Sequence, residues 1–131
     1  IVKNIYHARA ERRRLLALAA GRRLVVADGR ILELPDLEKG GNHYHIFLSH
    51  AWGTGQDQMR IVKQKVNEVL PNASVFLDVD DLKEGRGQEY VEMSAQVLIF
   101  VSQGYFVSVN CMRELLRTIS LGKPLITLVE A

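Results

Sequence analysis

Four short apolar segments alternate with helix-like segments between residues 43 and 131, and this alternation constrains the fold more than any other feature of the chain. The expected strands are residues 44–49, 74–79, 96–102 and 124–129. The third segment is apolar from Val97 to Val101, which is typical of a strand that is covered on both faces. Strands that alternate with helices predict a parallel sheet with helices on both faces, which is an α/β architecture.

Three helices are expected between these strands, at residues 56–70, 88–94 and 110–121. In the first, apolar residues recur at helical spacing, and Pro71-Asn72 marks its end. In the last, the apolar residues stand at i, i+3, i+4 and i+7, and they predict the face that packs on the core. These residues are Met112, Leu115, Leu116 and Ile119. Glu114 lies far round the helix from this stripe, so we expect it outside the core.

The first 42 residues differ in charge from the rest. They carry nine Lys and Arg against five Asp and Glu, whereas residues 43–131 carry eight against ten, so we interpret the two parts separately. Residues 1–34 are expected to form an N-terminal helix over 1–20 and a β-hairpin over 24–34. In the hairpin, Asp28-Gly29 supplies the two positive-φ positions of a type I′ turn. Residues 35–42 are expected to be a linker. The basic run ERRR (11–14) is interpreted as a solvated helix face or as a patch for nucleic acid or acidic lipid.

Length and composition limit the class of protein. The 131 residues suit one domain with an appendage, and 47% apolar residues are enough for a core. No apolar run approaches the roughly 18–20 residues that cross a bilayer. The single cysteine, Cys111, cannot form an internal disulfide, which favours a reducing, cytoplasmic location.

Topology predicts where a site would lie. Open α/β sheets bind ligands beyond the carboxyl ends of their strands, where the strand order reverses. In a flavodoxin-like order this point lies between the first and third expected strands, beside residues 49–53 and 102–104. The helix that begins near Asn110 brings Cys111 and Glu114 to the same end of the sheet. Glu114 is therefore either a solvated surface acid or part of a site at this crevice.

Other candidates have plainer interpretations. Cys111 is a nucleophile only beside a base such as His50, and otherwise a structural, partly buried residue. His43 and His45 share a strand face, but no further ligand completes a metal set. The GTGQ segment (53–56) is a plain turn or a phosphate contact at a helix N-terminus.

Five short motifs together resemble a known family. They are HIFLSH (45–50), VFLDVDDLKEGRG (75–87), VLIFVSQGYFVS (97–108), NCMREL (110–115) and GKPLITLV (122–129). In this order and spacing, residues 43–131 resemble a Toll/interleukin-1 receptor (TIR) domain. The resemblance implies a flavodoxin-like parallel sheet that here lacks a fifth strand, and a role in intracellular signalling or defence.

The resemblance implies two alternative activities. One is self-association with hydrolysis of NAD+ to nicotinamide and ADP-ribose, or its cyclic form, with Glu114 as the catalytic carboxylate. The other is a non-catalytic module that binds other TIR domains. NAD+ is then a substrate, and no cofactor, metal or nucleic acid is expected.

The resemblance also implies which other residues serve each activity. The residues implied for substrate binding are Ser49, His50, Trp52, Gly53, Asp80, Ser108 and Cys111. The implied interaction loop is Asp81, Leu82, Lys83, Glu84, Gly85, Arg86 and Gly87.

Overall fold

A four-stranded parallel sheet forms the centre of the protein in the computed structural model, which describes residues 5, 7–13, 24–77 and 86–131. The strands are β1 (Tyr44–His50), β2 (Val75–Leu77), β3 (Ser94–Val101) and β4 (Leu125–Val129). Their order is β2-β1-β3-β4, and every neighbouring pair is parallel. This order confirms the predicted flavodoxin-like α/β fold class.

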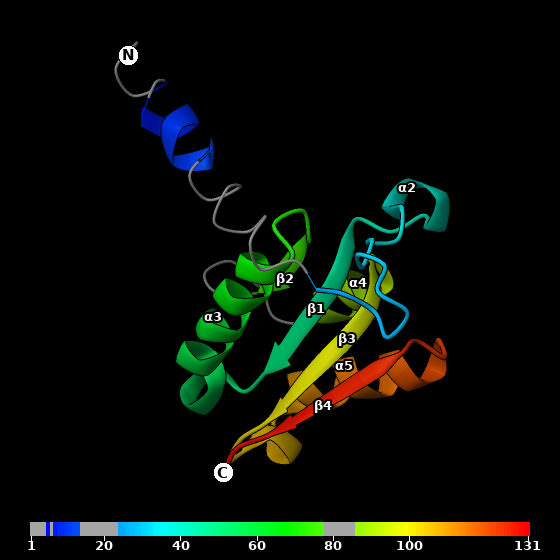
Figure 1. Ribbon diagram of the computed structural model, residues 1–131. Coiled ribbons are helices and arrows are strands. Elements are labelled where there is room, and N and C mark those ends of the chain that lie inside the picture. The colour runs from blue at the N-terminus through cyan, green and yellow to red at the C-terminus, as the bar shows by residue number, and fades with distance from the viewer. Residues whose placement is uncertain (1–4, 6, 14–23, 78–85) are drawn as a thin grey trace.

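Helices lie on both faces of the sheet. They are α3 (Trp52–Val69), α4 (Gly87–Glu92), the 3-10 turn η1 (Tyr105–Val107) and α5 (Val109–Ser120), whereas the short helix α2 (Leu37–Gly40) lies beyond the end of the strands. Figure 1 shows α3 on the side of the sheet that faces the viewer and α5 behind it. The core is divided accordingly. Met59 of α3 packs with Leu48 on one face, and Val91 of α4 and Cys111 of α5 pack with Phe47 on the other.

Helix α3 begins four residues earlier than predicted, so GTGQ lies inside its first turns. Two contacts explain this start. Thr54 Oγ1 donates to the backbone oxygen of Gln103 at 2.7 Å and hydrogen-bonds Ser102 Oγ at 2.8 Å. Gly55 packs so closely on β3 that a Cβ atom there would lie 2.9 Å from Phe100 Cδ1. These contacts join the start of α3 to the end of β3.

The turn at residues 26–30 differs from the predicted type I′ turn. Gly29 has φ of 87°, but none of the described non-glycine residues has a positive φ, so Asp28 does not supply the second such position. Instead, Gly29 N donates to Val26 O and Val26 N donates to Arg30 O, both at 2.9 Å. This is a three-residue loop with Gly29 in the left-handed conformation. A single bridge, Val25 to Ile31, pairs the two arms.

The predicted N-terminal helix lies only partly within the described residues. Ile5 and residues 7–13 are helical and exposed, whereas residues 1–4, 6 and 14–23 lie outside the described part. Among the described helices, none is long and apolar enough to cross a membrane.

The expected linker contains the short helix α2 and is fastened to the sheet. Asp36 caps α2, because its Oδ1 accepts from Glu38 N at 3.0 Å. His45 Nδ1 accepts from Ser74 N at 2.9 Å, so its Nε2 carries the proton and donates to Pro35 O at 3.1 Å. A cavity of about 680 Å³ lies where this segment meets the end of α3. His45 stands near the start of β1, so this cavity opens at the opposite end of the sheet from the predicted site.

Candidate functional site

Glu114 is buried, which corrects the prediction that it lies outside the core. Only 6% of its surface is exposed. The buried face of α5 consists of Cys111, Glu114 and Thr118. The four residues predicted to form the buried face of this helix are not its most buried ones. Met112 and Leu115 are partly buried, whereas Leu116 and Ile119 are 64% and 62% exposed. A buried carboxylate at the switch point of an α/β sheet is a candidate functional group.

Polar residues can occupy this buried face because their hydrogen bonds are made inside the protein. Thr118 Oγ1 donates to the backbone oxygen of Glu114 at 2.8 Å. The Glu114 carboxylate accepts from Ser49 Oγ at 2.6 Å through its Oε2 atom. Helical periodicity reports only which face is most apolar, so it missed this face.

Ser49 links Glu114 to a third residue, Tyr105. The Ser49 Oγ and Tyr105 hydroxyl oxygens are 2.8 Å apart. Ser49 is 1% exposed and Tyr105 is fully buried. The three side chains come from the end of β1, from η1 and from α5, so they meet at the carboxyl ends of the strands, as the topology predicted. Tyr105 was not among the predicted site residues, although the GYF segment offered a candidate buried aromatic between a strand and a helix.

Gly87, the first residue of α4, covers the other oxygen of the carboxylate. A Cβ atom at Gly87 would lie 2.2 Å from Glu114 Oε1 and 2.9 Å from Cδ and Cγ. Helices α4 and α5 are held together by Arg117, whose Nε donates to Glu92 Oε1 at 2.9 Å. Glycine therefore fits at residue 87 without displacing the carboxylate, whereas any side chain there would push Glu114 or α4 aside.

The environment of Glu114 changes the acidity of its neighbours. Burial raises the pKa of Tyr105, its hydrogen bond to Ser49 opposes this, and electrostatic repulsion from Cys111 and Glu114 adds to the rise. Burial likewise raises the pKa of Cys111, and the Ser108 hydrogen bond opposes this. Cys111 is 2% exposed, so it remains a buried thiol and fits the structural interpretation.

His50 does not join the Glu114 cluster. Successive residues of a strand point to opposite faces, so His50 lies on the α3 side and Ser49 on the α5 side. His50 is buried beside Gly55, its Nδ1 lies 3.2 Å from Leu48 O, and burial lowers its pKa. Ser49 and His50 therefore lie on opposite faces of the sheet and do not line one crevice, contrary to the prediction.

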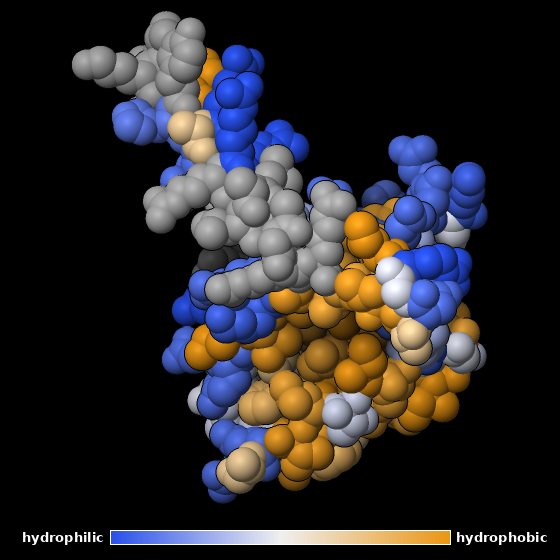
Figure 2. All heavy atoms as spheres, viewed as in Figure 1, coloured by the Kyte–Doolittle hydropathy of each residue, from blue (hydrophilic) through white to orange (hydrophobic). Residues whose placement is uncertain are grey.

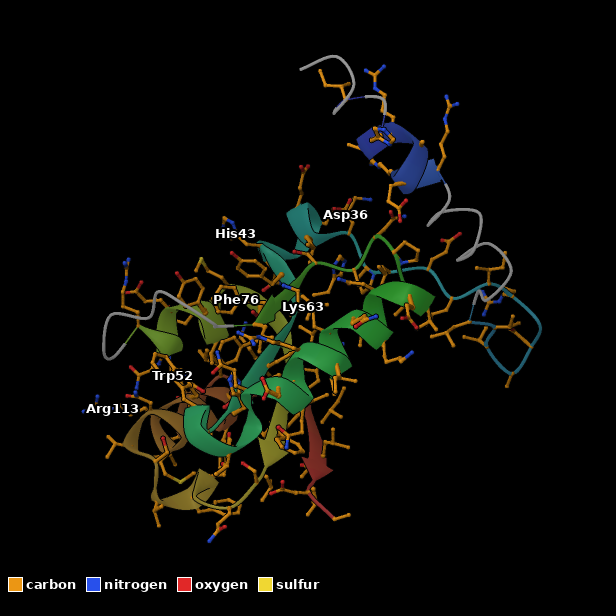
Figure 3. The ribbon with its side chains drawn as sticks, turned by 90° about the vertical axis from the view of Figure 1, so that its left-hand side faces the viewer. Asp36, His43, Trp52, Lys63, Phe76 and Arg113 are labelled. Atoms are coloured by element: carbon orange, nitrogen blue, oxygen red, sulfur yellow. The ribbon has the colours of Figure 1, made fainter. Side chains whose placement is uncertain are left out.

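The remaining predicted substrate contacts have different surroundings. Trp52 and Gly53 are exposed at the start of α3, and Figure 3 shows Trp52 on the same side of the molecule as Arg113 of α5. Ser108 is the N-cap of α5, and its Oγ accepts from Cys111 N at 3.4 Å. Asp80 lies outside the described residues.

The interaction loop is mostly outside the described part as well. Residues 81–85 are not described. Of the remaining two, Arg86 lies 3.3 Å from Glu89 in an exposed ion pair, and Gly87 is the residue against Glu114. Across residues 5, 7–13, 24–77 and 86–131, no three His, Cys, Asp or Glu side chains form a group that could hold a metal ion.

Comparisons with known proteins find structural similarity to TIR domains. The TIR domain of the Toll-related receptor TRR-2 from Hydra magnipapillata matches with a TM-score of 0.46 and 18% identity, over 64% of this chain and 68% of that one. The TIR domains of the activated Roq1 resistosome, which directly recognizes the pathogen effector XopQ, match with a TM-score of 0.48 and 21% identity. That match covers 66% of this chain and 57% of that one. No family model matches the sequence, and no curated protein matches it significantly.

Proposed function

We propose that residues 43–131 form a TIR-type domain that self-associates and hydrolyses NAD+ to nicotinamide and ADP-ribose, with Glu114 as the catalytic carboxylate. The observation that carries the proposal is the burial of Glu114 at the carboxyl ends of β1 and β3, where Ser49 donates to its Oε2 atom. A helix-surface acid has no reason to be buried and oriented in this way. The reaction class, cleavage of NAD+, is the one that the resemblance of residues 43–131 to TIR domains implies.

The chemistry needs one carboxylate. When the bond between nicotinamide and ribose breaks, both bonding electrons leave with the nicotinamide nitrogen, which becomes neutral, so no general acid is required. The ribose carbon becomes an oxocarbenium-like cation, as in other glycoside cleavages. A fixed carboxylate stabilises this cation strongly in a site of low dielectric constant. Water then adds to the carbon and releases a proton, giving ADP-ribose.

The start of α4 lies against the carboxylate. Glu114 is 6% exposed and Gly87 packs against its Oε1 atom, so a substrate that approaches from this side meets α4 first. Residue 87 ends the segment that the TIR resemblance implies for self-association. We therefore propose that association displaces the start of α4 and opens the site.

Nicotinamide release across a series of protein concentrations tests this proposal. The rate per molecule is expected to rise with concentration, because assembled protein is the open form. Glu114→Ala abolishes the release, whereas Asp57→Ala, which removes an exposed acid on α3, leaves it unchanged. Equal rates for the wild type and Glu114→Ala at every concentration would rule the catalytic role out.

The second candidate function is a non-catalytic interaction module, and exposed apolar side chains favour it. Leu116 and Ile119 of α5 are largely exposed, as is Val109 at the start of that helix. These three residues form an exposed apolar surface on α5. It is separate from the apolar side chains that Figure 2 shows over the opposite, α3 side of the sheet, where Ile126 and Leu128 of β4 are 43% and 40% exposed. An exposed apolar surface on a helix is typical of an association site, here with a second copy.

Lysine at Leu116 is expected to weaken self-association. The change places a charge in the apolar α5 surface, and we expect the dissociation constant to rise about tenfold. Ile61→Lys is the matched control, because Ile61 is 57% exposed on α3, on the other side of the sheet. Multi-angle light scattering over a concentration series measures both variants. Equal weakening by the two would place the association surface elsewhere.

A further inference from the structure

We infer that Ser49 and Tyr105 are positioning residues for Glu114. A directed series of hydrogen bonds, from Tyr105 to Ser49 to Glu114 Oε2, fixes the orientation of the carboxylate. This inference rests on the proposed function, because it assigns a task to the neighbours of the proposed catalytic group. It changes the role of Ser49, which the TIR resemblance implied as a substrate contact.

The direction of this series follows from the number of protons. A serine hydroxyl has one proton, and Ser49 gives it to Glu114 Oε2 at 2.6 Å. Ser49 Oγ can then only accept from the Tyr105 hydroxyl, which lies 2.8 Å away. The Tyr105 proton therefore points to Ser49, and the Ser49 proton points to Glu114. Ser49 stabilises negative charge on the carboxylate directly, and the hydrogen bond from Tyr105 strengthens Ser49 as a donor.

The backbone holds each donor in place. Ser49 lies near the end of β1, one of the two inner strands of the sheet, and is opposite Ile99 of β3. Tyr105 begins η1 directly after Gly104, whose φ of 88° turns the chain, and its N–H donates to Ser102 O at 3.1 Å. Both side chains are shielded from solvent. The hydrogen bonds from Tyr105 to Ser49 and from Ser49 to Glu114 Oε2 therefore need no reorganisation during a reaction.

The two carboxylate oxygens have different surroundings. Oε2 faces Ser49 inside the sheet–α5 interface, whereas Oε1 faces Gly87 at the start of α4. The other ionisable groups described around the carboxylate are Tyr105 on η1 and Cys111 on α5, and burial favours the neutral form of both.

Ser49→Ala and Tyr105→Phe test the inference in the full chain. The ¹³C chemical shift of the Glu114 carboxyl, followed against pH, reports its ionisation whether or not the protein is active. We expect the titration to move to higher pH in Ser49→Ala, which loses the donor to the carboxylate, and by less in Tyr105→Phe, which weakens that donor. The kcat for nicotinamide release falls about tenfold in Ser49→Ala with KM little changed, and the acid limb of its pH profile moves in the same direction.

Thr118→Val is the matched control, since Thr118 is buried on the same face of α5 but donates to backbone. It should leave the titration and kcat as in the wild type. Tyr105→Phe preserves the packed ring and so decides the question if Ser49→Ala fails to fold. An unchanged Glu114 titration in these variants would overturn the inference. A shifted titration in a protein that releases no nicotinamide would keep the directed hydrogen bonds and reject the proposed function.

Discussion

Alanine at Gly87 is expected to lower the free energy of unfolding by about 1–3 kcal/mol, the usual cost of forcing an extra methyl group into a packed site. The new Cβ atom would lie 2.2 Å from Glu114 Oε1. The end of a glutamate side chain can usually move aside at little cost. Here it is held by Ser49, so either that hydrogen bond or the start of α4 must shift. Chemical denaturation measures the change.

A double-mutant cycle identifies the cause of this loss. Glu114→Ala removes the atoms that the new methyl group meets, so Gly87→Ala should then cost nothing. Alanine favours a helix over glycine by about 0.5–1 kcal/mol, and Gly87 begins α4 without a positive φ, so the second change can even stabilise. The same cost of Gly87→Ala in both backgrounds would show that Glu114 is not its neighbour in solution.

Alanine at Gly55 is expected to be about as destabilising, by roughly 1–3 kcal/mol. Its Cβ atom would lie 2.9 Å from Phe100 Cδ1 and 3.2 Å from His50 Cβ, and both neighbours are buried in the sheet. Because a strand residue and an aromatic ring cannot move freely, α3 must tilt away from β1 and β3. Loss of its contact with the sheet accounts for the cost.

Gly53→Ala is the matched control for Gly55→Ala. Gly53 lies two residues earlier in the same helix, and nothing lies within 4 Å of its added Cβ atom. We expect this change to be neutral or to stabilise by about 0.5–1 kcal/mol through helix propensity. Urea unfolding of the two variants gives both values. Equal destabilisation by the two alanines would contradict the close packing of Gly55.

Much of the fold could be predicted because each strand has a local signature. The apolar run in β3 and the Pro71-Asn72 stop after α3 depend on near neighbours in the sequence, and the alternation of elements led directly to the parallel order. The turn at Asp28-Gly29 shows the limit of such signals. The Asp-Gly dipeptide is compatible with both a two-residue and a three-residue hairpin loop. In the three-residue loop that forms, Arg30 N donates to Asp28 Oδ1 at 3.0 Å.

The site was harder to predict than the fold. Topology correctly brought Glu114 to the carboxyl ends of β1 and β3, but the apolar stripe of α5 indicated the wrong buried face. That face is set by partners far away in the sequence, since Ser49 is 65 residues from Glu114 and 56 from Tyr105. Hydrogen bonds of this range have no local pattern. The separation of Ser49 from His50 follows from strand alternation, which the prediction of one shared crevice neglected.

Nicotinamide release by the wild type and by Glu114→Gln, at one concentration where both are assembled, tests the central proposal most directly. Glutamine keeps an oxygen that can accept from Ser49 and fits beneath Gly87, so the fold is preserved and only the charge is lost. We predict that the wild type releases nicotinamide and that Glu114→Gln does so at least about a hundredfold more slowly, the usual effect of removing one electrostatic contact to a transition state. Equal release by the two proteins, or none by the wild type, would contradict a catalytic role for Glu114.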